Sequence, residues 1–249
     1  MIRQGEVKGY SVAVTSTIFP REARDKSVVK SVYSPEQRLQ QTRATIDSLR
    51  ACGYGSILLL DNSGHRHRAQ LESAFADVQL GLFDHYQYDN KGISETLLLL
   101  DGLALLPDGV PIVKLSGRYL LTRPLCLDTG KYDLGARVYG HARRFGTVST
   151  MSTRCYVMRD KAVLQRYLLA LLEEIFSYSS RIVGPGSLKR FLANQFMPGR
   201  TPYSFFDPML SVEAASIDVV RRMGLRLLEL QSIGVKGLAG TFDNLAIED

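Results

Sequence analysis

The sequence of 249 residues predicts an α/β protein in which a mostly parallel central sheet is flanked by helices on both faces. Two observations lead to this fold class. Short apolar runs bounded by turn residues alternate with helical patterns through the first half of the chain, as buried parallel strands and their crossover helices do. The composition, 45% hydrophobic and 22% charged, suits a chain that buries a large core. We expect a single domain over residues 1–249, with a more mixed α/β C-terminal half.

The chain begins with a strand, a helix and a second strand. Residues 10–19 alternate between apolar and polar side chains and are rich in β-branched residues, which predicts the first strand. Ser34 as N-cap, followed by Pro35 and by a glutamine in the capping-box position, predicts a helix over residues 35–51. The apolar run at residues 56–64 ends in turn residues and predicts the second strand.

Helix and strand continue to alternate up to the middle of the chain. Residues 67–76 have a helical pattern, residues 78–88 contain the third strand, and residues 93–106 form a leucine-rich helix. Residues 110–121, VPIVKLSGRYLL, supply the fourth strand, which the order of elements places near the centre of the sheet.

The second half is less regular. Residues 133–160 indicate several short strands in a mixed or antiparallel part of the sheet. Residues 161–180 place apolar side chains at helical spacing and predict a strong helix. Two further helices are expected at residues 187–196 and 213–230, on either side of a proline-rich loop near 198–208.

The net charge of +6 suits an anionic small molecule, a nucleic acid or an acidic membrane surface, and does not choose among them. Cys52, Cys126 and Cys155 are far apart and form no CxxC pair, so neither a disulfide scaffold nor a cysteine zinc site is expected. The first residues lack the apolar segment of a signal peptide, and no apolar run approaches the ~18 residues of a membrane span. We therefore expect a cytoplasmic protein, with contact to the inner face of the membrane left open.

Polar residues follow each of the four predicted strands. They are Thr15, Ser16 and Thr17; Asp61, Asn62 and Ser63; Asp89, Asn90, Lys91 and Gly92; and Lys114, Ser116, Gly117 and Arg118. Ligands of open parallel sheets bind beyond the carboxyl ends of the strands, so these residues are candidates for one binding site. Neither GxGxxG nor GxxxxGK[ST] occurs, which disfavours dinucleotide oxidoreductases and P-loop enzymes.

The end of the fourth predicted strand has the side chains of a phosphate site. Alternation along a strand would place Lys114, Ser116 and Arg118 on one face, and Gly117 would let a ligand approach the backbone closely. Arginine binds two phosphate oxygens through its planar fork, while lysine supplies a point charge. The alternative is an exposed edge strand or an internal ion pair.

Less specific interpretations compete at the other loops. Asp61 is expected to bind the base or ribose of a nucleotide, yet Asp-Asn-Ser-Gly is also an ordinary strand-ending turn. Asn90 is a nucleotide-contact candidate that would also serve as a helix cap. His65 and His67 have no carboxylate cluster beside them, so we interpret them as part of a solvated basic loop.

A family resemblance adds to this interpretation. The segments YSVAVTSTIFP, QTRATIDSLRACGYGSILLLDNSG and YDNKGISETLLLLDGLALL, in this order, resemble the nucleotide-sugar-binding half of GT-A-fold glycosyltransferases. The resemblance covers about residues 10–122. It implies a Rossmann-like GT-A fold, with nucleotide-sugar binding at about 10–122 and acceptor binding at about 123–249.

The chain departs from the family at the metal site. Most GT-A enzymes carry an Asp-x-Asp pair that holds a divalent metal on the sugar diphosphate. This chain has Leu115-Ser116-Gly117-Arg118 there, and KLSGRY is similar to a group of bacterial and viral polysaccharide glycosyltransferases that lack the pair. We therefore expect no divalent metal, because fixed cations can stabilise a leaving phosphate instead.

These observations predict a metal-independent glycosyltransferase of surface polysaccharide biosynthesis. It would move a sugar from a nucleotide-sugar donor to a glycan or lipid-linked glycan. An inverting enzyme of this kind needs a base to take the acceptor proton. The carboxylate candidates are Asp160, Glu173, Glu174, Asp207 and Glu213. Glu173 or Glu174 is favoured and His141 is the reserve, against the alternatives of exposed helix glutamates and a solvated basic hairpin.

Two other functions remain open. A sugar-phosphate nucleotidyltransferase would favour a glycine-rich, cationic loop after the first strand; Arg21, Arg24 and Lys26 are present there but the glycines are not. A non-catalytic module that binds nucleic acid or an anionic glycan would use the basic charge. The basic and aromatic interleaving of single-strand binders is missing, so no nucleic acid is expected as a partner.

Overall fold

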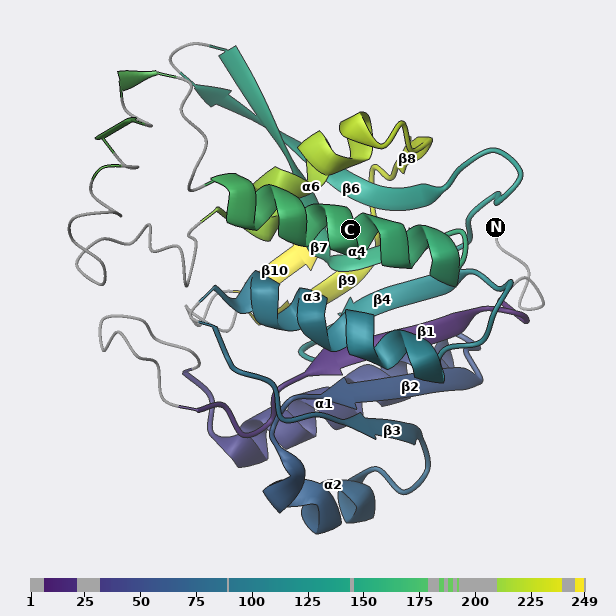
Figure 1. Ribbon diagram of the computed structural model, residues 1–249. Helices are drawn as coiled ribbons and strands as arrows, with labels where there is room; N and C mark the ends of the chain where they lie inside the picture. Colours follow the sequence, from purple (N-terminus) through teal and green to yellow (C-terminus); the bar gives the residue numbers. More distant parts are fainter. Residues whose placement is uncertain are drawn as a thin grey trace.

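The computed structural model describes residues 7–21, 32–88, 90–143, 146–178, 184–185, 188–189, 192, 210–238 and 245–248. Its centre is a seven-stranded sheet with helices on both faces (Figure 1). The strands of this sheet run in the order β3 (Gln79–Leu82), β2 (Ser56–Asp61), β1 (Ser11–Ser16), β4 (Ile112–Ser116), β7 (Gly146–Met158), β6 (Leu134–Arg143) and β8 (Leu227–Glu229). A three-stranded sheet contains β10 (Leu245–Glu248), β9 (Val235–Leu238) and β5 (Tyr119–Leu121).

The central sheet is mostly parallel, which confirms the predicted fold class. Strands β1 to β4 pair in parallel, and β4 is central as predicted. Strand β7 runs antiparallel to both β4 and β6, and β6 pairs in parallel with β8. The C-terminal half therefore gives the sheet its mixed part.

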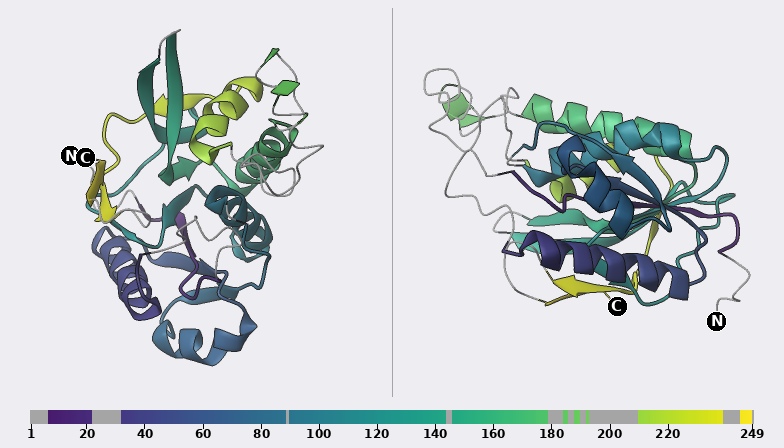
Figure 2. Two further views of the ribbon diagram at one scale, coloured as in Figure 1. Left: turned by 90° about the vertical axis from the view of Figure 1, so that its left-hand side faces the viewer. Right: turned by 90° about the horizontal axis from the view of Figure 1, so that it is seen from below.

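The helices cover the two faces of the sheet in separate groups (Figure 2). They are α1 (Pro35–Ala51), α2 (Arg68–Ala74), α3 (Lys91–Gly102), α4 (Lys161–Tyr178) and α6 (Val212–Arg222), with short 3₁₀ turns at His65–His67 and Leu103–Leu105. Alternate strand residues enter two apolar cores. Leu58 and Leu60 face α3, α4 and α6, whereas Ile57 and Leu59 face α1.

Helix α1 forms as the sequence predicts. The Ser34 side chain accepts a hydrogen bond from the backbone of Gln37, whose side chain accepts one from the backbone of Ser34. These bonds satisfy amides that the first turn leaves unpaired. The buried face of the helix carries Arg38, Thr42, Thr45, Ile46 and Leu49, so a cation lies in line with the core residues.

The predicted fourth strand is wrong in one respect. It ends at Ser116, and Gly117 and Arg118 form a turn that leads into β5 of the smaller sheet. Lys114 and Ser116 do share a face, since Nζ of Lys114 donates to Oγ of Ser116 at 2.8 Å. Arg118 does not extend that row, because the strand stops before it.

Two predictions in the second half are also wrong. Residues 133–160 contain one long hairpin, β6 and β7, in place of several short strands. The helix expected at 213–230 ends with α6, because Gly224 adopts φ 63° and Leu225 donates its amide to the Val220 carbonyl. This is a glycine C-cap, after which the chain turns into β8.

The helix expected at 187–196 and the loop near 198–208 lie almost wholly outside the described residues. Within the described part of the chain, none of the helices has the length and apolar character that crossing a membrane requires.

Candidate functional site

The carboxyl ends of β1, β2 and β4 meet at one edge of the sheet, which faces the viewer in the left panel of Figure 2. Thr15 is level with Ser116 of β4, and Ser16 is level with Asp61 of β2. The predicted loops are therefore neighbours in space. Their side chains divide between the two faces of the sheet.

A buried ion pair occupies the side that faces α3, α4 and α6. Nζ of Lys114 lies 2.7 Å from Oε1 of Glu95, and 1% of the Lys114 side chain is exposed. The same carboxylate accepts hydrogen bonds from Thr15 at 2.5 Å and from Ser116 at 3.0 Å. Burial opposes ionisation of Glu95, but the Lys114 ammonium and these hydrogen bonds outweigh it and lower the pKa of the carboxyl.

Lys114 has all three of its N–H donors engaged. They reach Glu95, the hydroxyl of Ser116 and the carbonyl of Thr153. The structure thus places Lys114 in an internal ion pair, and its charge is balanced by Glu95. Its direct contact with a phosphate, predicted from the sequence, would need these bonds to rearrange.

Asp61 and Asn62 hold the walls of the edge. The Asp61 side chain is fully buried, and its oxygens accept hydrogen bonds from the amides of Ile18 at 3.0 Å and Ser63 at 2.8 Å. Burial raises the pKa of this carboxyl. Asn62 accepts the amide of His85 at 2.8 Å. Both side chains therefore position the loops after β1 and β3, and a nucleotide contact of Asp61 stays a prediction.

Asn90 and Gly92 join the start of α3 to the start of α6. Asn90 caps α3 by accepting the Gly92 amide at 3.1 Å, and its Nδ2 donates to the Leu210 carbonyl at 3.0 Å. A Cβ added to Gly92 would lie 1.7 Å from a methyl of Val212, so the two helix ends pack without space between them. Lys91 is exposed at the first position of α3.

The turn after β4 passes to the α1 side of the sheet. Thr42 of α1 donates its hydroxyl to the Gly117 carbonyl at 3.0 Å, and the Gly117 amide donates to the Thr15 carbonyl at 2.8 Å. Arg118 is half-buried, with its guanidinium carbon 5.9 Å from the ring centre of Tyr119. Among the described residues it forms no ion pair. Thr17 lies half-buried in the loop beyond β1.

Arg38 is a functional candidate that the sequence reasoning missed. It is 8% exposed, and its Nε is enclosed without a hydrogen-bond partner among the described residues. Burial, followed by the nearby charge of Arg118, lowers its pKa to about 10, while Asp61 acts in the opposite direction. Its spacing of four residues before Thr42 could have identified it, because Thr42 belongs to the buried stripe of the helix.

Glu213 is a carboxylate of the second half of the chain that is linked to the Glu95–Lys114 pair through Thr153. Its Oε1 accepts the Thr153 hydroxyl at 3.1 Å, and the Thr153 carbonyl is the group that accepts from Lys114. Glu213 is exposed in the first turn of α6. The sequence predicts Glu213 as one of five candidate bases and does not favour it over the others.

The favoured base candidates lie apart from this cluster. Oε2 of Glu174 pairs with Arg222 at 2.9 Å, and the largely exposed Glu173 lies 3.8 Å from the same arginine. These contacts join α4 to α6. His141 lies in β6, level with Val148 of β7. The hairpin of β6 and β7 projects from the sheet (Figure 1). A role for these three residues stays a prediction.

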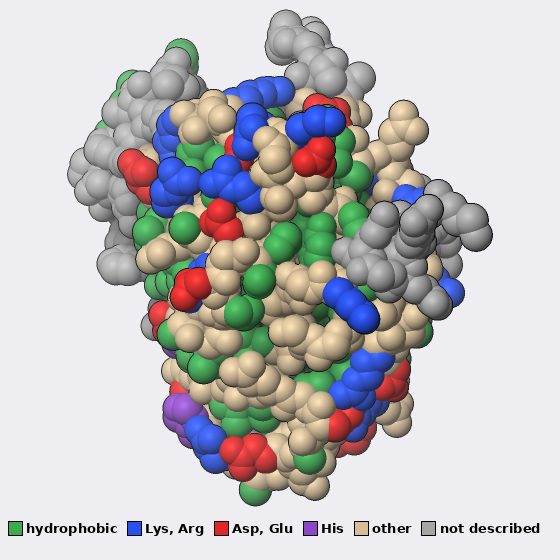
Figure 3. Space-filling model, turned by 90° about the vertical axis from the view of Figure 1, so that its right-hand side faces the viewer, with side chains coloured by type: hydrophobic (Ala, Val, Ile, Leu, Met, Phe, Trp, Pro, Cys, Tyr) green, Lys and Arg blue, Asp and Glu red, His purple; other side chains and the backbone are tan. Residues whose placement is uncertain are grey.

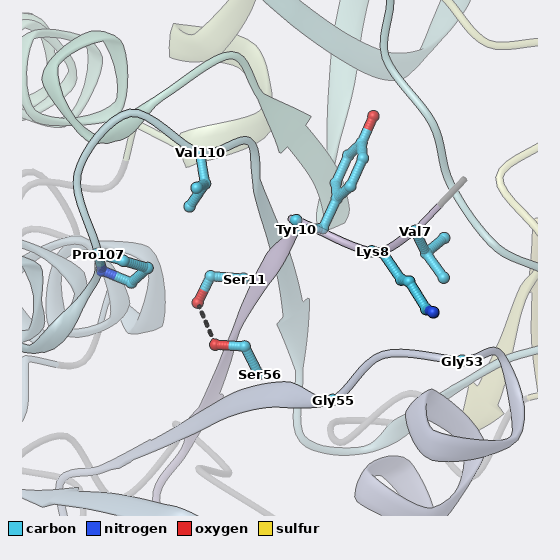
Figure 4. A pocket seen from close by; sticks show the side chains of 10 residues that line it. Val7, Lys8, Tyr10, Ser11, Gly53, Gly55, Ser56, Pro107 and Val110 are labelled. Atoms are coloured by element: carbon cyan, nitrogen blue, oxygen red, sulfur yellow. Dashed lines mark hydrogen bonds between the residues drawn. The ribbon is translucent and has the colours of Figure 1, made fainter. Parts of the chain in front are cut away.

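The opposite edge of the sheet contains a pocket of about 500 Å³ at the amino ends of β1 and β2 (Figure 4). Its lining includes Lys8, Tyr10, Pro107 and the hydrogen-bonded pair Ser11 and Ser56, 3.3 Å apart. Among the described residues that line it there is no carboxylate. Positive and negative side chains are interspersed on this face of the molecule (Figure 3). The carboxyl edge thus holds the stronger concentration of reactive groups.

No group of three or more His, Cys, Asp or Glu residues with the geometry of a metal site occurs within the described ranges.

Comparisons with known proteins found similar solved structures but no related sequence. No protein-family model and no curated protein matches the chain. Among solved structures it is similar to an inositol-1-phosphate CTP transferase from T. maritima (8% identity, 89% of this chain and 85% of that chain, TM-score 0.49). It is also similar to a nucleoside-diphosphate-sugar pyrophosphorylase from Vibrio cholerae RC9 (11% identity, 90% of this chain and 93% of that chain, TM-score 0.47). The bifunctional glycosyltransferase WbbM is similar over 66% of this chain and 34% of the WbbM chain (13% identity, TM-score 0.39). At these identities and TM-scores, the likeness supports no particular function.

Proposed function

We propose that this chain is a glycosyltransferase that moves a sugar from a nucleotide-sugar donor, with arginine acting on the donor phosphate in place of a divalent metal. The observation that carries the proposal is the position of Arg118. It lies in the turn directly beyond the central parallel strand β4, at the edge where such sheets bind ligands. It has no carboxylate partner among the described residues, so its donors are available to an anion.

The two sides of the edge suit the two halves of the reaction. The acceptor hydroxyl oxygen forms a bond to the anomeric carbon of the donor, while the bond from that carbon to the phosphate oxygen breaks. The electron pair of the broken bond passes to the phosphate. Arg118, on the α1 side, would stabilise this growing negative charge.

The acceptor proton needs a base on the other side. We propose Glu213, because it is exposed at the edge and hydrogen-bonded to Thr153. The buried Glu95–Lys114 pair would then act by holding β4, β7 and α3 in place between the two groups. The acceptor that we propose is a glycan or lipid-linked glycan, in surface polysaccharide assembly on the cytoplasmic side of the membrane.

Sugar-phosphate nucleotidyl transfer is the alternative, and a non-catalytic module that binds nucleic acid or an anionic glycan is the third candidate. A nucleotidyltransferase would need cations from the loop after β1. Arg21, at the end of the described part of that loop, is paired with Asp84, which counts against this reading. The products separate the two enzymes, since nucleotidyl transfer from a nucleoside triphosphate releases pyrophosphate.

The test is product formation from a panel of UDP-, GDP-, dTDP- and CMP-linked sugars in EDTA, with water as the default acceptor. Release of a nucleotide is expected from one donor class, and Arg118→Ala is expected to reduce the rate by about 100- to 1000-fold. Its melting temperature should stay close to that of the unmodified chain. Equal rates in the two proteins would refute the role of Arg118. Pyrophosphate release from triphosphate and sugar phosphate would favour the alternative.

A further inference from the structure

Two arginines meet on the α1 side of the carboxyl edge. Arg38 precedes Thr42 by one helical turn, and Thr42 donates its hydroxyl to the carbonyl of Gly117, the residue before Arg118. This contact brings α1, one turn after the buried Arg38, against the turn that carries Arg118, and the charge of Arg118 acts on Arg38. The two arginines are about 80 residues apart in the chain, and the hydrogen bond between Thr42 and Gly117 joins the segments that carry them.

The pair is not neutralised within the described part of the chain. Arg38 donates no side-chain hydrogen bond there, and its Nε is enclosed without an acceptor. The negative charge of Asp61 acts on Arg38, but its oxygens accept hydrogen bonds from the amides of Ile18 and Ser63. A buried guanidinium beside a second cation is costly unless an anion completes the site.

We infer that Arg38 and Arg118 together bind a diphosphate, so that the donor is a nucleoside-diphosphate sugar and not a CMP-linked sugar. This inference rests on the proposed function for the identity of the donor. Two guanidiniums match the two negative charges of an esterified diphosphate, whereas the phosphodiester of a CMP-sugar carries one. Each guanidinium can form charge-assisted hydrogen bonds with phosphate oxygens.

A purely structural Arg38 would behave differently from a ligand-binding one. If its stem and charge stabilise the fold, Arg38→Met lowers the melting temperature of the free protein. If it is held for an anion, Arg38→Met removes a buried, unpaired charge while keeping most of the apolar stem. The free variant should then melt at the same temperature or higher, and lose affinity for diphosphates.

The experiment is calorimetric titration in EDTA with CDP, UDP, GDP and dTDP, each compared with its monophosphate. We expect the bound diphosphate to exceed its monophosphate in affinity by about 10- to 100-fold, the range for one charged hydrogen-bonded contact. Arg38→Met and Arg118→Met should each remove most of that difference. Arg68→Met is the matched control, because Arg68 forms an exposed pair with Glu72 on α2. It should leave both affinities unchanged.

Equal affinity for diphosphate and monophosphate, or an Arg38→Met variant with unchanged diphosphate affinity, would overturn the inference. So would a loss of binding that Arg68→Met reproduces. The inference and the proposed function fail separately. If diphosphate binding depends on the two arginines but no donor gives sugar transfer, the diphosphate site is supported and the glycosyltransferase function is refuted. Sugar transfer by the unmodified chain, together with unchanged diphosphate affinity in Arg38→Met, would support the glycosyltransferase and exclude the two-arginine site.

Discussion

The ammonium of Lys114 lies 2.7 Å from the carboxylate of Glu95, and this pair joins the central strand β4 to helix α3 beneath the carboxyl edge of the sheet. With 1% of the Lys114 side chain exposed, the pair is almost completely shielded from water on the lysine side. Removing either partner leaves the other charge poorly compensated. The ion pair is therefore part of the framework that positions the two sides of the candidate site.

Glu95→Gln should destabilise the protein by about 3 to 5 kcal/mol, the range for breaking one side of a buried ion pair. The free energy of unfolding from urea titration measures this. Asp108→Asn is the control, since Asp108 pairs with Lys161 at the same 2.7 Å but is 88% exposed. It should cost no more than about 1 kcal/mol. Similar losses in both variants would contradict the framework role of Glu95.

The Glu95–Lys114 pair should also make the free energy of unfolding depend on pH. The folded state lowers the pKa of Glu95 below its ordinary value, so its stabilising contribution is complete above the unfolded pKa of about 4.3. That contribution is lost as the pH falls from there through the lower folded pKa. Glu95→Gln should therefore be less stable at pH 7 and decline less steeply below about pH 4.3. Parallel curves for the two proteins would exclude this linkage.

Gly237→Ala should disturb the site from the smaller sheet. A Cβ at this position would lie 2.4 Å from the carbonyl oxygen of Arg118, so β9 and the turn must separate. Overpacking of this kind costs about 1 to 3 kcal/mol, and it should also weaken nucleotide binding. Gly55→Ala is the control, because no atom lies within 4 Å of its added Cβ. If Gly237→Ala lowers stability but keeps full nucleotide affinity, the contact of β9 with the turn does not contribute to nucleotide binding.

Glu213→Gln should reduce kcat by about 100- to 10000-fold with a small effect on KM, because it removes the proposed acceptor base. Glu173→Gln and Glu174→Gln make the comparison with the bases first favoured by the sequence. If one of these lowers kcat and Glu213→Gln does not, the base lies on α4.

The sequence carried the local features of this fold and lacked the long-range ones. The capping box of α1 is a signal of four residues, so helix 35–51 could be predicted with its true bounds. Gly224, two residues after Arg222, is a C-cap signal in the sequence, and the helix predicted over residues 213–230 runs past it into β8. The alternation of apolar and polar residues predicted β1, and the apolar run that ends in turn residues predicted β2.

The partners of buried charges could not be predicted from the sequence, because they depend on how distant elements pack. Glu95 lies in the polar first turns of a leucine-rich helix, and its contact with Lys114 depends on how α3 packs across the sheet. Likewise, the end of β4 at Ser116 follows from the pairing of β5 with β9, which is more than 100 residues distant. The sequence therefore indicated which loops form the edge, but not which cations remain available to an anion.

The most direct test of the central claim is calorimetric titration of nucleoside diphosphates, in EDTA and in Mn²⁺, against the unmodified chain and Arg118→Met. The account predicts that one diphosphate binds equally well in EDTA and in Mn²⁺, and that Arg118→Met weakens this binding by about tenfold or more. Binding that requires Mn²⁺ and is unchanged in Arg118→Met would contradict it.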